Sequence, residues 1–211
     1  MLVKHLMTPE PISISPELSV AEAGEIMTTK GIRHLPVMEE GRLVGLVTRS
    51  SLARALPGLG TGLTRFEYNY LTSNTKIRQV MIGEPAVGTE DMAAEEAARV
   101  MNAERISSLL VIRDGQPVGI ITDTDIFEAM LELLGARREG LRVTIHLPDR
   151  PGELSKIAGV VAGAGGNISA VGGWPVEEGT WGAVLKIQNL SSEQVSEAVG
   201  RVPGASLVDL R

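Results

Sequence analysis

Two polar side chains, Thr122 and Asp125, directly follow an apolar, β-branched run at residues 118–121. The helical spacing of Ile126 and Met130 after them predicts a strand that runs straight into a helix. A helix start presents unpaired N–H groups to an anion, and a carboxylate in its first turn accepts two hydrogen bonds from a vicinal diol. This corner is therefore predicted to hold a phosphate and a ribose.

A second copy of this corner lies at residues 44–52, with Ser51 where the later copy has Asp125. Gly45 and Gly119, which mark the two copies, are 74 residues apart. The same separation relates these further identical pairs: Met7 and Met81, Pro11 and Pro85, Ala23 and Ala97, Met27 and Met101, Ile32 and Ile106, Leu35 and Leu109, Val37 and Val111, Gly41 and Gly115, and Thr48 and Thr122. A register this long without a gap predicts an internal duplication.

The composition is that of an ordinary globular chain of 211 residues, 43% hydrophobic and 22% charged, which is long enough for two or three small domains. Its net charge of −6 and its few aromatic residues disfavour nucleic-acid binding, which needs basic grooves and stacking platforms. The absence of cysteine excludes disulfides, thiolate metal sites and cysteine nucleophiles. No apolar run suits a signal peptide or a membrane span, so the sequence predicts a soluble, cytoplasmic protein without membrane contact.

Each copy is predicted to fold in the order strand, helix, strand, strand, helix. In the first copy, Ser19 and Glu22 form a capping-box pattern, and Gly31 ends the helix. The predicted elements of this copy are a strand at 12–14, the helix after Ser19, a hairpin across 35–38 and 43–47, and a helix at 50–56. Those of the second copy are a strand at 86–88, a helix at 91–103, a hairpin across 109–121 and a helix from Thr122 to Gly135.

Residues 57–74 join the copies and are predicted to be a linker. The glycines Gly58, Gly60 and Gly62 follow no strand and have the spacing G-x-G-x-G, so a dinucleotide-binding loop is the weaker interpretation. Three aromatic residues follow close together: Phe66, Tyr68 and Tyr70. They favour a linker that packs on a domain or a dimer partner, and the alternative is a lid over a bound base.

Residues 141–211 predict a separate domain with the order βαββαβ, the ferredoxin-like arrangement. Apolar and polar residues alternate at 141–147, as in a half-buried strand, and a turn at 149–152 precedes a helix with one apolar face. Strands at 167–174 and 181–187, a helix at 192–200 and a strand at 206–210 complete the domain.

The duplicated part resembles a tandem pair of cystathionine-β-synthase (CBS) domains, through Met7-Thr8-Pro9, residues 31–37 and above all residues 119–125. The last part resembles an ACT domain through residues 149–154 and Gly166-Asn167-Ile168. The implied fold class is α/β (α+β), with CBS domain one at 1–60, a linker at 61–74, CBS domain two at 75–135 and a ferredoxin-like ACT domain at 141–211. This domain order resembles that of the acetoin-utilisation AcuB-type proteins.

The CBS resemblance implies an adenosine-nucleotide sensor with up to two clefts, for which AMP or ATP is the expected ligand and no cofactor is required. Each cleft takes the Thr-x-x-Asp motif and strand start of one repeat and the opening segment of the other. Carried over, cleft two consists of Thr122, Asp125, Ser107, Ser108, Thr8 and Ile12. Cleft one consists of Thr48, Arg49, Ser51, Arg33, His34, Ile82 and Ala86.

The two clefts are predicted to be unequal. Cleft two has the ribose acceptor Asp125, but Asp123 opposes a phosphate there. Cleft one lacks that carboxylate, whereas Arg33 and Arg49 favour a phosphate through charge-assisted hydrogen bonds. We therefore expect cleft two to be the better adenosine site, and cleft one to be weaker or led by the phosphate. The alternative is that Asp125 only caps its helix and that neither cleft fills.

The ACT resemblance implies an amino-acid effector site where two domains pair, made of Asp149, Pro151, Gly152, Leu154, Asn167 and Ile168. Helix-start N–H groups suit a carboxylate, and Asp149 and Asn167 suit an α-amino group. Gly166-Asn167 also suits a left-handed turn without any ligand, so both interpretations stand. Pairing of two domains is favoured over ligand binding, because an open four-stranded sheet leaves edges that a partner can cover.

The sequence contains no constellation for catalysis. The motifs G-x-S-x-G, Walker A and H-E-x-x-H are absent, and His5, His34 and His146 lack the spacing of metal ligands. The sequence therefore predicts a non-enzymatic, homodimeric regulator with small-molecule effectors at both pairs of modules. The rival hypothesis is a structural adaptor that dimerises and docks another protein, such as an enzyme of acetoin metabolism, without a ligand. A third hypothesis is an accessory subunit of a transporter or channel.

Overall fold

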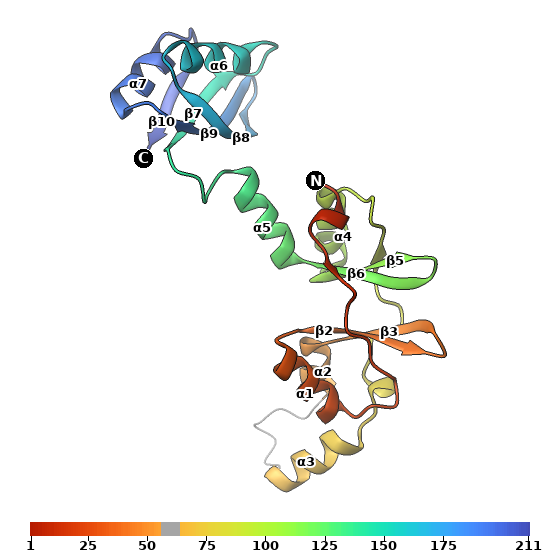
Figure 1. Cartoon of the computed structure of the whole chain (residues 1–211). Helices are drawn as coiled ribbons and strands as arrows, with labels where there is room; N and C mark the ends of the chain where they lie inside the picture. The colour runs from red at the N-terminus through yellow and green to blue at the C-terminus, as the bar shows by residue number, and fades with distance from the viewer. Residues whose placement is uncertain (56–63) are drawn as a thin grey trace. The chain divides into compact units, whose positions relative to one another are not determined.

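The computed structural model describes residues 1–55 and 64–211, which divide into two compact units, Met1–Ile126 and Phe127–Arg211 (Figure 1). The predicted glycine linker at Gly58, Gly60 and Gly62 lies outside the described residues. Among the described residues, no helix has both the length and the apolar character needed to cross a bilayer.

The first copy of the duplication folds in the predicted order. Its elements are α1 (Val20–Lys30), the antiparallel hairpin of β2 (His34–Glu39) and β3 (Arg42–Thr48), and α2 (Arg49–Ala55). The predicted capping box is confirmed: Ser19 Oγ accepts the Glu22 N–H at 3.2 Å, and the Glu22 carboxylate accepts the Ser19 N–H at 2.7 Å. The strand predicted at 12–14 is only a parallel bridge between Ile14 and Val37.

The second copy repeats this arrangement. It contains β4 (Val87–Gly88), α4 (Ala94–Glu104), the antiparallel hairpin of β5 (Ser108–Arg113) and β6 (Gln116–Thr122), and α5 (Asp123–Leu133). The two hairpins have equivalent registers, because His34 faces Thr48 in the first and Ser108 faces Thr122 in the second. The three side chains of Leu46, Leu110 and Ile120 form a buried cluster where the hairpins meet.

Each copy is completed by the segment that opens the other one. The N-terminal segment, with η1 (Val3–His5) and β1 (Thr8–Pro9), packs on the second copy: β1 pairs with β6, and Val3 is buried in the second copy's core. The turn η2 (Ile77–Gln79) instead packs on the first copy, where Ile77 is fully buried. This exchange ties the two copies into one compact unit.

The repeated Val-Gly dipeptide marks the places where the exchanged segments cross the hairpins. A Cβ on Gly119 would lie 2.3 Å from Met7 Sδ, and a Cβ on Gly45 would lie 2.8 Å from the Ile82 carbonyl oxygen. Both distances are below any normal carbon contact, so a side chain at either position needs its neighbour to move: the backbone of Ile82 at Gly45, and the flexible Met7 side chain at Gly119. The glycine of the repeated Val-Gly dipeptide is therefore explained by the close packing of an exchanged segment against each hairpin.

The segment predicted as a linker contains a helix, α3 (Arg65–Asn74), which corrects the prediction for residues 65–74. Its start is fixed by a capping box in which Thr64 Oγ1 accepts the Glu67 N–H at 3.2 Å. The helix packs against α1. Phe66 and Tyr70 lie on its exposed surface, with 79% and 62% of their area accessible.

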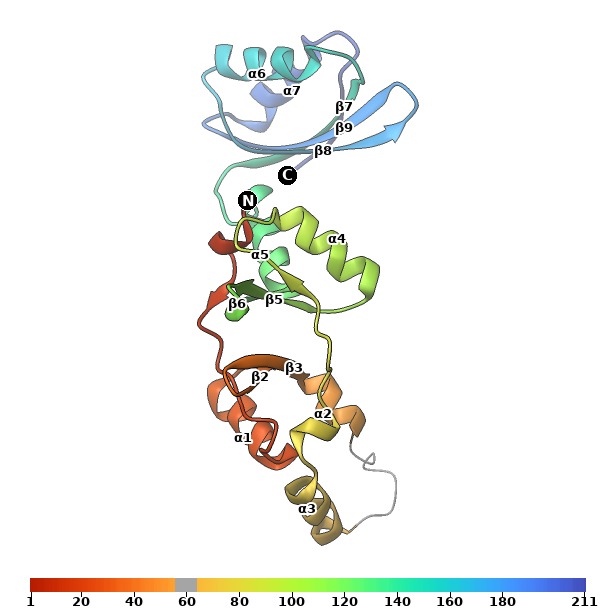
Figure 2. The same cartoon turned by 90° about the vertical axis from the view of Figure 1, so that its right-hand side faces the viewer.

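The C-terminal unit has the predicted βαββαβ order. Its elements are β7 (Leu141–Pro148), α6 (Glu153–Gly163), β8 (Asn167–Glu177), β9 (Thr180–Gln188), α7 (Ser192–Gly200) and β10 (Ser206–Leu210). The four strands form an antiparallel sheet in the order β10-β7-β9-β8. Both helices cover one face of this sheet (Figure 2), and the core between them is aliphatic. The strands β8 and β10 are its edges.

Candidate functional site

Two cavities of similar size lie in the first unit, and each contains one of the predicted threonines. Cleft two has a volume of about 370 Å³ and contains Thr122. It is lined by Thr8, Glu10, Pro11, Ile12, Gly31, Ile32, Arg33, His34, Ile120 and Thr122. Cleft one has a volume of about 400 Å³ and contains Thr48. It is lined by Leu46, Thr48, Ser50, Arg54, Ile82, Glu84, Pro85, Ala86, Glu104, Arg105, Ile106, Ser107 and Ser108.

The two clefts are related by the 74-residue repeat. Glu10 and Pro11 of cleft two correspond to Glu84 and Pro85 of cleft one, and the other lining residues of cleft two have equivalents in cleft one in the same way. Each cleft is therefore built from the opening segment and the strand start of one copy, together with the threonine that ends the second hairpin strand of the other copy.

This arrangement corrects the predicted composition of the clefts, in which each strand start was placed in the same cleft as the threonine of its own copy. Arg33 and His34 line cleft two, and Ser107 and Ser108 line cleft one. The reason is that the segment before each strand reaches across to the other copy. Arg33 Nη2, for example, donates to Thr124 Oγ1 at 3.1 Å, at the start of α5.

Arg49 and Ser51, both predicted for cleft one, do not line it. Arg49 points to the opposite side of α2, where it lines a different cavity. Ser51 is buried and exchanges hydrogen bonds with Thr48: its Oγ accepts the Thr48 N–H at 3.0 Å and donates to the Thr48 carbonyl oxygen at 3.0 Å. The prediction that cleft one gathers the phosphate-binding arginines Arg33 and Arg49 is therefore wrong.

The start of α5 has no free N–H group in its first turn for an anion. The Asp123 N–H donates to the Ser107 carbonyl oxygen at 3.0 Å, and the Thr124 N–H donates to Asp123 Oδ1 at 2.7 Å. The Asp125 N–H lies 3.4 Å from Thr122 Oγ1. The first turn of α5 therefore offers no backbone N–H to an anion in cleft two, whose basic side chains are Arg33 and His34.

Asp125 caps its helix, as the alternative interpretation proposed. Its Oδ2 accepts the Thr122 N–H at 2.7 Å and the Thr122 hydroxyl at 2.8 Å. Both bonds use the same oxygen, and the side chain is half-exposed. Oδ1 accepts no hydrogen bond from the described residues, but Asp125 is not among the residues that line cleft two and adjoins the cleft only through Thr122.

His34 lies at the boundary between the clefts. Its Nε2 is 3.5 Å from Ser107 Oγ, which belongs to cleft one. Burial and the neighbouring Arg33 guanidinium lower the pKa of the His34 imidazole, while the carboxylates of Asp123 and Asp125 oppose the change. The neutral imidazole is therefore favoured in the folded protein, and it can either donate or accept a hydrogen bond.

The lowered pKa of His34 predicts a pH-dependent stability. Because the unfolded chain binds the proton more readily than the folded chain, the free energy of unfolding falls as the pH drops through the unfolded value near 6.5. We expect the parent protein to lose stability more steeply than His34→Gln between about pH 7.5 and about pH 5. Urea unfolding of both proteins across this range measures the difference, and parallel curves would contradict the assignment.

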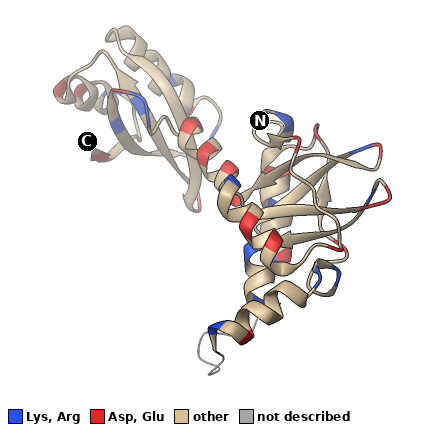
Figure 3. Ribbon diagram, turned by 60° about the horizontal axis from the view of Figure 1, so that its bottom comes forward, with Lys and Arg blue, Asp and Glu red and all other residues tan. Residues whose placement is uncertain are grey.

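The charges around the two clefts differ. The lining of cleft one contains two arginines and two glutamates, namely Arg54, Arg105, Glu84 and Glu104. Cleft two contains Arg33, His34 and Glu10 and lies at the start of α5. Acidic residues follow one another along that helix (Figure 3): Asp123 and Asp125 lie in its first turn, and Glu128 and Glu132 pair with Arg137 and Arg138. The carboxylates of Asp123 and Asp125 in this first turn act on the His34 imidazole of cleft two.

The predicted effector residues of the C-terminal unit lie at opposite ends of its sheet. Pro148, next to Asp149, pairs with Thr180, whereas Asn167 pairs with Gln188 at the other end of β9. Helix α6 separates the two groups by a length of about 16 Å, from its eleven residues. One copy of the chain therefore cannot bring Pro151, Gly152 and Leu154 together with Asn167 and Ile168, and the predicted site requires a second copy.

The aromatic residues of α3 do not cover cleft one or cleft two. Tyr68 lines the same cavity as Arg49, and neither Phe66 nor Tyr70 lines cleft one or cleft two. The hypothesis of an aromatic lid over a bound base is therefore wrong for these residues. Among the described residues, no group of three or more His, Asp or Glu side chains is arranged to hold a metal ion.

Several residues line the two clefts without having been predicted from the sequence, among them Glu10, Pro11, Glu84, Arg105 and Arg54. Glu10, Pro11 and Glu84 lie within the opening segments that the prediction used at 8–12 and 82–86, and Arg105 lies two residues before the predicted Ser107. Arg54 needed a different signal: it stands four residues after Ser50 on α2, so that both share one helix face.

Comparison with known proteins agrees with the duplicated fold. The CBS domain matches residues 3–58 and 77–132. Among curated proteins, the chain is 31% identical over 128 residues to L-aspartate semialdehyde sulfurtransferase from Methanocaldococcus jannaschii, covering 59% of this chain and 22% of that protein. It is 27% identical over 146 residues to inosine-5'-monophosphate dehydrogenase from Korarchaeum cryptofilum, covering 69% of this chain and 28% of that protein. The chain thus spans less than a third of these two enzymes.

Three solved structures resemble the same part of the chain. The CBS domain pair of protein MJ0100, in complex with 5'-methylthioadenosine and S-adenosyl-L-methionine, is 30% identical with a TM-score of 0.51 and covers 62% of this chain and 99% of that one. CBSX2 in complex with AMP is 26% identical with a TM-score of 0.52 and covers 63% of this chain and 97% of that one. A protein from Vibrio cholerae assigned to acetoin utilization (AcuB) is 25% identical with a TM-score of 0.54 and covers 66% and 98%.

The predicted tandem CBS pair is thereby confirmed, and residues 133–211 lie outside the match. Because the CBS domain matches both copies of the internal duplication, and these copies form the two related clefts, this chain belongs to the CBS-domain family.

Proposed function

We propose that this chain is a non-enzymatic regulatory protein that senses an adenosine nucleotide, and that cleft two is its principal nucleotide site. The observation that carries the proposal is the joint placement of Thr122, Arg33 and His34 in one cavity, with the Asp125 carboxylate hydrogen-bonded to Thr122 behind the lining. The complexes of MJ0100 with S-adenosyl-L-methionine and of CBSX2 with AMP support it, because both ligands carry an adenosine.

In the proposed complex the ribose hydroxyls donate to Asp125 Oδ1, the atom that the helix cap leaves free. Arg33 has five N–H donors, one of which goes to Thr124, so its guanidinium can bind a phosphate as well. The apolar side chains of Ile12, Ile32 and Ile120 line the same cavity and give the adenine an apolar surface. Cleft one contains Thr48 but no equivalent carboxylate, because Ser51 replaces it. Cleft one is therefore proposed as the weaker site.

Cleft two is proposed to prefer AMP over ATP. It offers one arginine and one largely neutral histidine to the phosphate, and Glu10, Asp123 and Asp125 lie nearby. Each further phosphate adds negative charge close to these carboxylates, and that charge opposes binding.

Calorimetric titration of the purified protein with AMP, ADP, ATP, NAD and S-adenosyl-L-methionine tests the proposal. We expect AMP or S-adenosyl-L-methionine to bind more tightly than ATP, and a ligand at a hundred times its dissociation constant to stabilise the fold by about 2.7 kcal/mol in thermal unfolding. If no adenosine compound binds at millimolar concentration, the sensor function is wrong, and a ligand-free adaptor that docks another protein takes its place.

We also propose that residues 141–211 form an ACT domain that pairs with a second copy of the chain and binds an amino acid between the copies. The βαββαβ order and the open edges of β8 and β10 support the pairing. The separation of Asp149 from Asn167 along α6 supports a site completed by the partner copy. Titration with the common amino acids, alongside the molar mass by light scattering, tests both parts: a monomer, or a dimer that binds none of them, would contradict the effector site.

A further inference from the structure

A third cavity lies in the first CBS copy, between α1, α2 and α3. Its volume of about 460 Å³ falls within the range of small-molecule sites. Val20, Met27 and Leu52 form a buried apolar floor. The small residues Ala21, Gly24 and Ala53 leave the space above this floor open, and a Cβ on Gly24 would meet no heavy atom within 4 Å.

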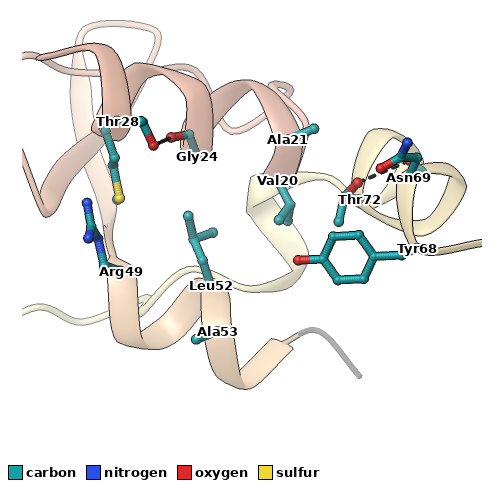
Figure 4. Close-up of a pocket in the computed structure, with 11 residues that line it drawn as sticks. Val20, Ala21, Gly24, Thr28, Arg49, Leu52, Ala53, Tyr68, Asn69 and Thr72 are labelled. Carbon is teal, nitrogen blue, oxygen red and sulfur yellow. Dashed lines mark hydrogen bonds between the residues drawn. The ribbon is translucent and has the colours of Figure 1, made fainter. Parts of the chain in front are cut away.

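Polar groups stand at the two ends of this cavity. Figure 4 shows Arg49 at one end, and at the other end the Tyr68 ring beside Val20, with Asn69 on the same helix. The hydroxyls of Thr28 and Thr72 are already used, since they donate to the carbonyl oxygens of Gly24 and Asn69 at 2.9 and 3.1 Å. Within the described part of the chain, no carboxylate lines the cavity and no ion pair includes Arg49. The cavity therefore combines an apolar floor with a single positive charge.

This cavity is distinct from the nucleotide clefts, although α2 is a wall of both it and cleft one. Arg49, Leu52 and Ala53 project from one face of α2 into the third cavity. Ser50 and Arg54 of the same helix line cleft one on the other side. The helical spacing of these residues places the two sets on different faces, so a ligand in one cavity does not occupy the other.

We propose that the third cavity binds a small organic anion with an apolar body, a carboxylate of the size of an arylalkanoic acid. The apolar part lies over Val20 and Leu52, and the carboxylate accepts charge-assisted hydrogen bonds from the Arg49 guanidinium. Tyr68 and Asn69 close the far end, which assigns these two residues of α3 to a ligand site.

Calorimetric titration of the full chain with 4-phenylbutyrate, in the absence of nucleotide, tests this site independently of the proposed sensor function. The uncharged 4-phenylbutan-1-ol serves as the matched ligand. We expect the carboxylate to bind the parent about tenfold more tightly than the alcohol, and Arg49→Gln to remove this difference, because a hydrogen bond to a charged group is lost. Arg42→Gln, which changes an exposed arginine that lines none of the three cavities, should retain it.

A second variant fills the cavity without opening the core. Gly24→Leu places a side chain in the open space, and we expect it to abolish 4-phenylbutyrate binding while thermal unfolding shows a folded protein of at least parental stability. The proposal is overturned if 4-phenylbutyrate fails to bind the parent at millimolar concentration. It is equally overturned if Gly24→Leu binds the carboxylate as well as the parent does, or if Arg49→Gln still prefers the carboxylate to the alcohol.

Discussion

Asp125→Ser is expected to weaken AMP binding about 100-fold while leaving the stability of the protein nearly unchanged. The loss follows from two hydrogen bonds between the ribose hydroxyls and a charged acceptor, each of which contributes about 1.5 kcal/mol. The unchanged stability follows from the first copy of the duplication. There Ser51 accepts the Thr48 N–H at 3.0 Å, the same cap that Asp125 supplies to the Thr122 N–H at 2.7 Å.

The serine at this position therefore separates the two roles of Asp125. Asp125→Ala removes the cap as well as the ribose acceptor, and we expect it to cost about 1 kcal/mol of unfolding free energy in addition to the lost affinity. Calorimetry with AMP and urea unfolding of the parent and both variants make the comparison. If Asp125→Ser binds AMP as tightly as the parent, Asp125 is only a capping residue, and the ribose is bound elsewhere or not at all.

The sequence was informative wherever a short local pattern determines the local structure. The Ser19-Glu22 capping box predicted the start of α1, and Thr122-Asp125 predicted the junction of β6 and α5. Helix α3 was overlooked, although Thr64 and Glu67 form the same kind of capping box, because the neighbouring glycines suggested a linker. The capping-box pattern of Thr64 and Glu67 indicates a helix start, but the glycine-rich composition just before it favoured a linker.

The composition of the clefts depended on packing between distant segments, which no local pattern reveals. The exchange of opening segments placed Val3 in the core of the second copy and Ile77 in the core of the first. The CBS resemblance was taken to group the strand start at Arg33 with Thr48 of the same repeat, whereas the Arg33 side chain reaches Thr124 of the other copy. The direction of Arg49 was predictable in part, since Leu52 and Ala53 follow it at helical spacing and face the same cavity.

The exchange itself makes Gly45 a sensitive position. A Cβ on Gly45 would lie 2.8 Å from the backbone carbonyl oxygen of Ile82, which accepts the Leu46 N–H at 2.9 Å. Ile82 also lines cleft one, so the backbone must either lose this hydrogen bond or move within the cleft. We therefore expect Gly45→Ala to lower the free energy of unfolding by about 1–3 kcal/mol, the usual cost of overpacking.

Two alanine substitutions at other glycines serve as controls in urea unfolding. At Gly119 the contacting atoms belong to the flexible Met7 side chain, which can move aside, so Gly119→Ala should cost less than Gly45→Ala. At Gly24, inside α1, the new methyl group meets nothing within 4 Å, so Gly24→Ala should stabilise the helix by up to about 1 kcal/mol. If all three variants have the same stability, the crossing segments tolerate a side chain at these positions. The repeated Val-Gly dipeptide would then need an explanation other than the exchange that builds both clefts.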